Sequence, residues 1–230
     1  MFNDRWKFSR ADSGSRAGLS PRPPAAFNGG ATSDGRDVYS RHSSGLEQFF
    51  SHISGETGLR LLDFSGASQA NIGFITNLGC KLYSEDMLQT LDLAFGEGSY
   101  YENQMQPERV DEFVNQNLNF PGDHFDGVLL WDILEFLAPP LLKATMDRLR
   151  EIVRPGSYLM ALFHAEDRAG NVPVYSYRIG DSKTLLLAPR GLRQPAQFFN
   201  NRAVENVFQG FESVKFFLSR DSLREVIVKR

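Results

Sequence analysis

A strand–helix–strand pattern between Leu59 and Glu85 limits the fold of this chain more than any other feature. Residues 59–64 form a short apolar run typical of a buried strand, and residues 71–78 predict a helix that closes at Gly79. Residues 81–85 predict a second strand. Elements this close in sequence are joined by a right-handed crossover between parallel strands. We therefore expect a parallel sheet with helices on its faces.

The same alternation continues to His164. Residues 125–131 are almost continuously apolar, as expected for a strand covered on both faces. A helix is predicted from Pro139–Pro140 to Val153, ended by Pro155–Gly156, and a further buried strand at residues 158–164. Alternating strands and helices indicate an α/β fold with a doubly wound sheet.

After His164 the pattern changes to hairpins. Residues 175–179 and 183–187 predict one hairpin with its turn at Gly180–Asp181. A short helix at 202–209 precedes two strands at 211–218 and 223–228. The parallel sheet is therefore expected to end in an antiparallel C-terminal hairpin, and the segment 166–199 to be an insert that carries its own hairpin.

The composition divides the chain at residue 44. Residues 1–43 are rich in Ser, Gly, Pro and Arg and have almost no periodic apolar residues, which predicts a disordered tail. Ser44 and Glu47 have the spacing of a capping box, followed by an apolar stripe from Leu46 to Ile53. We expect one folded domain at residues 44–230.

Charge and apolar patterning exclude several classes of protein. The net charge of -3 and the pI near 5.8 give no strong signal for nucleic-acid binding. The apolar runs are far shorter than a membrane-spanning helix. The N-terminal residues are not followed by the apolar stretch of a secretory signal. Cys80 is the single cysteine, so we expect no internal disulfide and no metal site. These features favour a cytoplasmic protein without a membrane anchor.

The turn after the first of these strands carries the strongest functional signal. Leu61-Leu62-Asp63 is followed by a loop whose one glycine is Gly66. An apolar pair and an acid before such a turn resemble the first motif of the class I S-adenosylmethionine-dependent methyltransferases. In that family three glycines follow the acid, and Ser65, Ala67 and Gln69 stand in their places here. The chain therefore resembles the family with a degenerate glycine loop.

The spacing beyond the loop agrees with the family without a gap. The family's first helix ends at a glycine and its second strand at an acid, and these positions correspond to Gly79 and Asp86. A carboxylate at the end of that strand accepts hydrogen bonds from both ribose hydroxyls of the cofactor. Residues 119–137 and 149–159 resemble the fourth-strand region and the Arg-Pro-Gly turn of the family, so the likeness spans about residues 57–164.

The resemblance implies a Rossmann-like methyltransferase fold with a mostly parallel seven-stranded sheet, and S-adenosylmethionine as the cofactor. Asp63 either orients the amino group of the cofactor or ties down the loop amides. Trp131 either lines the cofactor pocket or belongs to the core. Carried over residue by residue, the predicted cofactor contacts are Asp63, Ser65, Gly66, Ala67, Asp86, Met87, Asn115 and Trp131.

Two residues at strand ends are the catalytic candidates. His164 ends a strand at the cofactor edge of the sheet, and a neutral imidazole suits proton removal near neutral pH. Its alternative is a structural histidine. Asp132 follows Trp131 at the same edge, where it either faces substrate or caps the next helix.

Two functions follow from these observations. The first is methyl transfer from S-adenosylmethionine to a small-molecule or protein acceptor. The second is a catalytically inactive binding or scaffold protein of the same fold, suggested by the missing loop glycines. The segments 87–117 and 166–199 would set the acceptor, and the hairpin of the second could also form a homodimer contact.

Overall fold

The computed structural model describes residues 38–165, 170–217 and 223–230. The described part of the predicted tail begins at Val38, and residues 39–42 form a short strand, β1 (Tyr39–His42). The expected boundary at residue 44 is therefore wrong by a few residues. The rest of the predicted tail lies outside the described residues.

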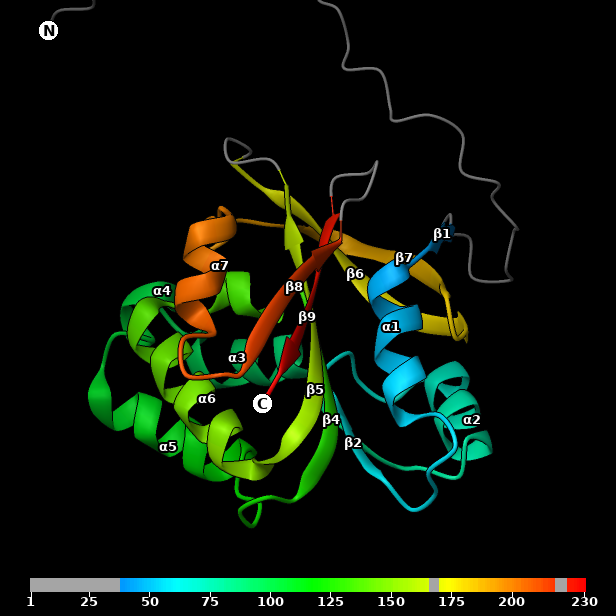
Figure 1. Ribbon diagram of the computed structural model, residues 1–230. Helices are drawn as coiled ribbons and strands as arrows, with labels where there is room; N and C mark the ends of the chain where they lie inside the picture. The colour runs from blue at the N-terminus through cyan, green and yellow to red at the C-terminus, as the bar shows by residue number, and fades with distance from the viewer. Residues whose placement is uncertain (1–37, 166–169, 218–222) are drawn as a thin grey trace, which may run out of the picture.

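A twisted sheet in the order β3-β2-β4-β5-β9-β8 forms the centre of the molecule (Figure 1). The first four of these strands run parallel, and β9 and β8 add an antiparallel edge. This confirms the doubly wound α/β fold with an antiparallel C-terminal hairpin. The strand bounds are β2 (Arg60–Asp63), β3 (Lys81–Ser84), β4 (Phe125–Trp131), β5 (Val153–His164), β8 (Ser213–Phe217) and β9 (Leu223–Lys229).

Six strands make up this sheet in the part of the chain that the structure describes, one fewer than the resemblance implies. The segment between β3 and β4 forms helices instead of a further strand. Its apolar residues are spaced three and four apart, as in Met87, Leu88, Leu91 and Phe95, which buries one face of a helix. The three helices are α3 (Met87–Phe95), α4 (Tyr100–Asn103) and α5 (Pro107–Asn117).

Helices cover both faces of the sheet. In Figure 1, α1 (Ser44–Ile53) and α2 (Gln69–Asn77) lie on one side, and α5, α6 (Pro139–Ile152) and α7 (Asn201–Val207) lie on the other. The predicted capping box places the start of α1 correctly, but the cap is Ser43, whose side chain accepts a hydrogen bond from the Leu46 amide. A short 3₁₀ helix, η1 (Ile133–Phe136), follows β4.

The predicted insert hairpin is present and longer than expected. It consists of β6 (Val172–Asp181) and β7 (Thr184–Arg193), which pair antiparallel. Asp181 pairs with Thr184, so the turn lies at residues 182–183 and not at Gly180–Asp181. β7 also pairs with β1, which gives a second sheet of order β1-β7-β6. No sequence pattern predicts β1, which has only four residues.

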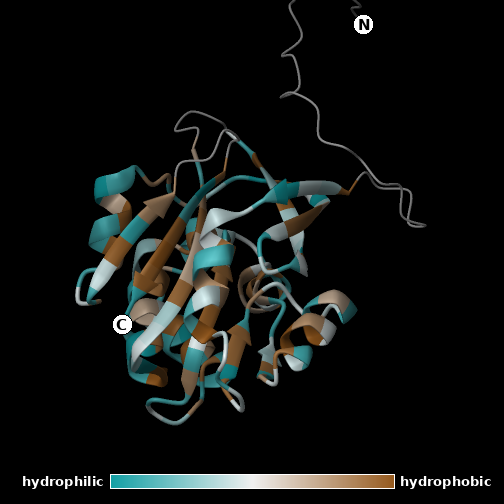
Figure 2. Ribbon diagram, turned by 45° about the vertical axis from the view of Figure 1, so that its right-hand side comes forward, coloured by the Kyte–Doolittle hydropathy of each residue, from teal (hydrophilic) through white to brown (hydrophobic). Residues whose placement is uncertain are grey.

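The core lies between the central sheet and its two helix layers. Every residue of β4 is buried, and Figure 2 shows the central strands as mainly hydrophobic. Gly127 in β4 is needed for this packing, because a Cβ there would lie 2.8 Å from Leu61 Cδ2 and 2.9 Å from Phe49 Cζ. Among the described residues, no helix combines the length and apolar character needed to cross a lipid bilayer.

A buried ion pair joins the N-terminal elements to the sheet edge. Arg41 of β1 lies 2.5 Å from Glu225 of β9, and the second carboxylate oxygen of Glu225 accepts a hydrogen bond from the Gly45 amide at 2.6 Å. The carboxylate therefore holds β1 and the first turn of α1 against β9. Breaking one partner would leave a buried charge uncompensated.

Candidate functional site

The order of the strands places a crevice beside the carboxyl end of β2. The chain passes from β2 through α2 to β3 on one side, and then crosses β2 to reach β4 on the other. In open α/β sheets a ligand binds where the strand order reverses in this way. The loops after β2, β3 and β4 meet there, and they contain most of the residues predicted from the sequence.

Asp63, the last residue of β2, is completely buried and organises the loop that follows it. Its Oδ1 atom accepts hydrogen bonds from the Ser65 amide at 2.9 Å and from Trp131 Nε1 at 2.6 Å. Its Oδ2 atom accepts a hydrogen bond from Asn71 Nδ2 at 2.8 Å. Burial raises the pKa of Asp63 above its ordinary value, although these hydrogen bonds act to lower it. Of the two roles open for Asp63, tying down the loop is the one visible in these contacts.

Gly66 brings the loop against the end of β3. Its φ angle is 84°, in the left-handed region, and its amide donates to the Glu85 carbonyl at 3.1 Å. A Cβ at this position would lie 3.0 Å from the Cβ of Asp86. The one glycine that remains in the loop is thus the one that the close approach requires. Ser65 and Asp86 also form an isolated β-bridge.

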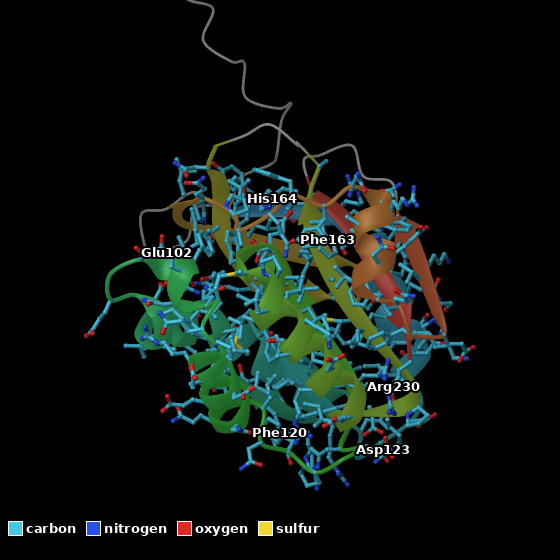
Figure 3. All side chains as sticks on the ribbon, turned by 90° about the vertical axis from the view of Figure 1, so that its left-hand side faces the viewer. Glu102, Phe120, Asp123, Phe163, His164 and Arg230 are labelled. Carbon is cyan, nitrogen blue, oxygen red and sulfur yellow. The ribbon has the colours of Figure 1, made fainter. Side chains whose placement is uncertain are left out.

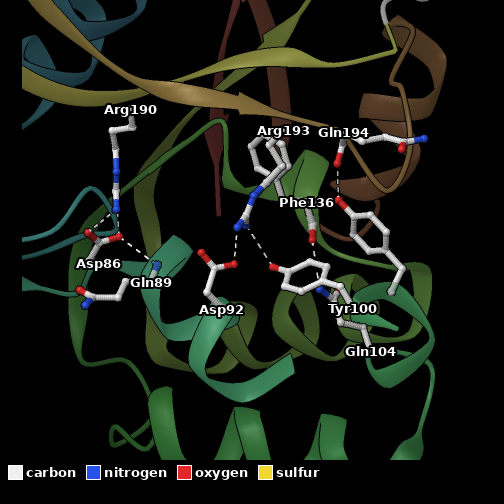
Figure 4. Close-up of polar contacts among 10 residues, drawn as sticks. Asp86, Gln89, Asp92, Tyr100, Gln104, Phe136, Arg190, Arg193 and Gln194 are labelled. Atoms are coloured by element: carbon white, nitrogen blue, oxygen red, sulfur yellow. Dashed lines mark hydrogen bonds and ion pairs between the residues drawn. The ribbon is translucent and has the colours of Figure 1, made fainter. Parts of the chain in front are cut away.

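Asp86 lies at the carboxyl end of β3, as its spacing predicts. Its Oδ1 atom accepts a hydrogen bond from the Gln89 amide at 3.1 Å, so the side chain caps α3. The same carboxylate receives a two-pronged ion pair from Arg190 of β7, with both nitrogen–oxygen distances at 3.0 Å (Figure 4). Planar guanidinium groups pair with carboxylates in this geometry. The predicted ribose ligand is therefore engaged by the hairpin.

Tyr177 of β6 covers the end of β4. Its ring stacks on Trp131 with the ring centroids 4.9 Å apart and the planes 2° from parallel. Both side chains are almost fully buried, and Trp131 has a φ of 52°, a conformation that few residues other than glycine adopt. Trp131 therefore lines the predicted cofactor cleft and is at the same time core, because the hairpin has closed over it.

Asn71 of α2 fixes the hairpin in this position. Its side-chain amide donates to the Tyr177 carbonyl at 3.1 Å and accepts from the Ile179 amide at 2.8 Å. A second contact follows at α3, where Arg193 pairs with Asp92 and hydrogen-bonds Tyr100 Oη at 3.2 Å (Figure 4). The hairpin is thus attached to α2, to the tip of β3 and to α3.

These contacts leave almost no space in the cleft. The cavity lined by the loop after β2, the end of β4 and the hairpin has a volume of about 10 Å³. A single water molecule needs about that much, whereas ligand pockets have volumes of several hundred Å³. The polar groups for a nucleoside-type cofactor are present, but S-adenosylmethionine does not fit the cleft in this conformation. We therefore derive no catalytic step through it.

His164 and Asp132 belong to a buried polar cluster beneath the hairpin. His164 ends β5, at the opposite end of the sheet from the ion pair of Arg230 with Asp123 (Figure 3). Its Nδ1 atom lies 2.6 Å from Glu135 Oε2, and its amide donates to Glu135 Oε1 at 3.0 Å. Because only 3% of His164 is exposed, its side chain is closed off from a substrate in this conformation. Its predicted catalytic role stays a prediction.

The cluster has shifted proton affinities. Burial raises the pKa of Asp132 to about 6. Burial lowers the pKa of His164, but the hydrogen bond and charge of Glu135 outweigh that effect and raise it overall. Burial and the negative charge of Asp132 raise the pKa of Tyr177 well above its usual range. Asp132 stands at the N-cap position of η1, but its side chain makes no capping hydrogen bond there.

The remaining predicted cofactor contacts lie in different surroundings. Ala67 is exposed in the loop after β2, and Met87 is buried in the first turn of α3, next to Asp86. Asn115 is exposed on α5, a helix that packs against α6, and it does not line the cleft. In this conformation Asn115 is separated from the cleft, and its predicted contact with the cofactor stays a prediction. No cluster of metal-binding side chains occurs among the residues that the structure describes.

Sequence reasoning missed the residues that close the cleft. Asn71 and Arg190 act through partners about a hundred positions away in the chain, and no local pattern marks such pairs. Tyr177 was visible as an aromatic residue of the insert, but its position over Trp131 was not. Glu135 follows Asp132 by one helical turn, and this spacing could have indicated a shared polar site.

Comparisons with known proteins give structural likenesses only. No family model matches the sequence, and no curated protein gives a significant match. The glycopeptide N-methyltransferase MtfA, solved with S-adenosyl-L-methionine, shares 13% identity over 86% of this chain and 98% of its own, with a TM-score of 0.46. A SAM-dependent methyltransferase from Archaeoglobus fulgidus shares 14% identity over 80% of this chain and 91% of its own, with a TM-score of 0.45.

A third solved structure is the 1,6-didemethyltoxoflavin-N1-methyltransferase of Burkholderia thailandensis, with bound 1,6-didemethyltoxoflavin and S-adenosylhomocysteine. It shares 11% identity over 81% of this chain and 76% of its own, with a TM-score of 0.44. All three are methyltransferases, two of them solved with S-adenosylmethionine or S-adenosylhomocysteine bound. At these identities and TM-scores the likeness assigns no function to the present chain.

Proposed function

We propose that this protein is an S-adenosylmethionine-dependent methyltransferase whose cofactor site is the cleft between the ends of β2, β3 and β4. The observation that carries the proposal is the position of Asp86. It follows β3 and lies against the Ser65–Gly66 loop, which follows β2 at the reversal of the strand order between β2 and β4. A carboxylate placed there accepts hydrogen bonds from two neighbouring hydroxyls of a ribose.

The contact with Arg190 supports this assignment. Two guanidinium nitrogens of Arg190 each lie 3.0 Å from a different oxygen of Asp86. A ribose diol presents two adjacent donors of the same kind. The carboxylate is therefore placed and oriented for a paired donor.

The acceptor of the methyl group is a small molecule or a protein, and its identity stays a prediction. The same holds for the homodimer contact and for the cytoplasmic location. The segments expected to set the acceptor include the hairpin that now fills the cleft, so the acceptor site would form only after the hairpin moves.

A second candidate function is a binding or scaffold protein of this fold without catalysis. One observation favours it, namely the cavity of about 10 Å³ where the cofactor would lie. The same residues that would hold a nucleoside hold the hairpin instead. The two candidates differ in whether a ligand can ever replace the hairpin.

Calorimetric titration with S-adenosylhomocysteine separates the candidates. The titration uses the full chain, Arg190→Ala, and Arg190→Ala combined with Asp86→Asn. Methyl-transfer function predicts saturable binding by Arg190→Ala and binding about tenfold or more weaker by the double variant, because a charge-assisted hydrogen bond contributes roughly 1.5 to 3 kcal/mol. No binding by any of the three folded proteins at millimolar ligand contradicts the proposal and favours the scaffold.

A further inference from the structure

The hairpin β6–β7 occupies the cleft in the manner of a ligand. Tyr177 places an aromatic ring flat on Trp131, and Arg190 places paired donors on Asp86. The two contacts lie at the ends of β4 and β3, so the hairpin spans the width of the cleft. We propose that this hairpin is a built-in plug, which closes the site in the resting protein and has to leave before a nucleoside-type ligand binds.

Competition for Asp86 is the first reason. Both carboxylate oxygens of Asp86 are within 3.0 Å of Arg190, and one of them also caps α3. A ribose diol and the guanidinium group cannot occupy the same two oxygens together. Binding of one therefore requires release of the other, which makes the ligand and the closed hairpin mutually exclusive.

The second reason is the way the hairpin is attached. β6 and β7 pair with each other and with β1, and neither strand pairs with the six-stranded sheet. On the cleft side, β6 is an edge strand whose Tyr177 carbonyl and Ile179 amide bond to a side chain, that of Asn71. No backbone ladder joins the plug to the central sheet, so opening leaves the pairing of the central strands intact. Opening has to expose the buried apolar side chains that the hairpin adds to the common core, namely Val172, Val174, Ile179, Leu185 and Leu187.

The contacts differ in strength, and this sets how the plug opens. Asp86 and Arg190 are each about a quarter to a third exposed, so their ion pair is screened by solvent. Tyr177 is buried and stacked, and its removal would empty a space against Trp131. Of these two contacts within the cleft, Tyr177 is thus the stronger and the Arg190 pair the weaker. A ligand binds with an apparent affinity reduced by the fraction of molecules that are open.

The role of the hairpin as a plug rests on the proposed function. One of the two measurements therefore needs no ligand, so that failure of the plug and failure of the proposed function can be distinguished. The Ile179 amide is protected by Asn71 Oδ1, so its hydrogen-exchange rate measures opening. Arg190→Ala is expected to raise this rate up to about fivefold, as for loss of a screened ion pair. Arg178→Ala removes an arginine from the same hairpin away from Asp86 and serves as the matched control, with an unchanged rate.

The second readout is binding of S-adenosylhomocysteine. Against the wild type, we expect affinity to rise up to about fivefold in Arg190→Ala and at least about a hundredfold in Tyr177→Ala, with no change in Arg178→Ala. In a Trp6→Phe background Trp131 is the single tryptophan, so its fluorescence reports loss of the Tyr177 stack when the ligand binds.

Each outcome decides one of the two proposals. Faster exchange at Ile179 in Arg190→Ala with tighter ligand binding supports the plug. Equal affinities in the wild type and Arg190→Ala, without a change in exchange or in Trp131 fluorescence, overturn the plug and leave the proposed function standing. Faster exchange without binding by any variant overturns the methyltransferase assignment and leaves the plug standing. If Tyr177→Ala does not fold, the Arg190→Ala and Arg178→Ala pair still decides.

Discussion

The loop after β2 and the hairpin β6–β7 meet in one cleft but are supported in different ways. The loop is held mainly by residues close in sequence, since Asp63 bonds Ser65 and Asn71 within eight positions, and its more distant partner is Trp131 of β4. The hairpin is held by partners more than a hundred positions away, in Asn71 and Asp86. Variants of the loop should therefore unfold the domain, whereas variants of the hairpin should open it locally.

The largest effect is expected at Asp63. Asp63→Ala removes the acceptor for the Ser65 amide, Trp131 Nε1 and Asn71 Nδ2, and leaves these donors buried. We expect the free energy of unfolding to fall by about 3 to 4 kcal/mol. Urea denaturation measures it, and Asp181→Ala, at the exposed hairpin turn, is the control with a change of about 0.5 kcal/mol or less. A loss below about 1 kcal/mol would show that the loop does not depend on this carboxylate.

A pH dependence is expected from the polar cluster beneath the hairpin. Asp132 has a raised pKa of about 6 against an ordinary value of 3.8, so the folded state binds a proton more tightly than the unfolded chain. The free energy of unfolding should therefore fall as pH rises from about 4 to 6, by up to about 3 kcal/mol. Burial raises the pKa of Glu135 against the hydrogen bonds and charge of His164 and the charge of Arg224, and this raised pKa and that of His164 act with the same sign.

Asp132→Asn isolates this contribution. The amide does not titrate, so the difference in unfolding free energy between the wild type and Asp132→Asn should change across pH 4 to 6. Urea denaturation at pH 4, 5, 6 and 7 gives the difference. A constant difference across this range would mean that Asp132 keeps its ordinary pKa and that the space beneath the hairpin is open to water.

An intermediate effect is expected at Gly66. Gly66→Ala adds a Cβ at 3.0 Å from the Cβ of Asp86 and forces alanine into a φ of 84°. We expect a loss of about 1 to 2 kcal/mol in the free energy of unfolding. Gly55→Ala is the matched control, because Gly55 has a φ of 90° but no atom near the added Cβ. Equal losses in the two variants would show that the approach to Asp86 costs nothing.

The difference between loop and hairpin also explains what the sequence could predict. Gly79 and Asp86 were located from the spacing to the motif acid in the family that the sequence resembles. The spacing transfers because a strand, a helix and a strand of ordinary length leave little freedom between them. The insert was predicted as a hairpin from two short strands on either side of Gly180–Asp181, although the turn lies at residues 182–183. These predictions use patterns within short stretches of sequence. They succeed because contacts between residues close in sequence determine these helices and strands.

Position in space was less accessible to prediction. Asn115 was assigned to the cofactor from its alignment beside a position that contacts adenine in the family, and this alignment does not give its place on α5 relative to the cleft. β1 has four residues, too few for a recognisable period, and it forms because β7 offers it an edge. The pairing of Arg190 with Asp86 joins residues 104 positions apart. Such contacts depend on the position of the hairpin against the central sheet. Packing of the whole core determines that position.

The smallest effect on stability, and the sharpest separation of the two regions, is expected at Arg190. Its ion pair with Asp86 is partly exposed, so Arg190→Ala should change the free energy of unfolding by less than about 1 kcal/mol. The same variant should speed hydrogen exchange at Ile179 while leaving the Leu129 amide in the centre of β4 unchanged, because opening of the hairpin leaves the central sheet intact. If both amides accelerate together, the hairpin unfolds with the domain, and the distinction between a fixed loop and a removable hairpin fails.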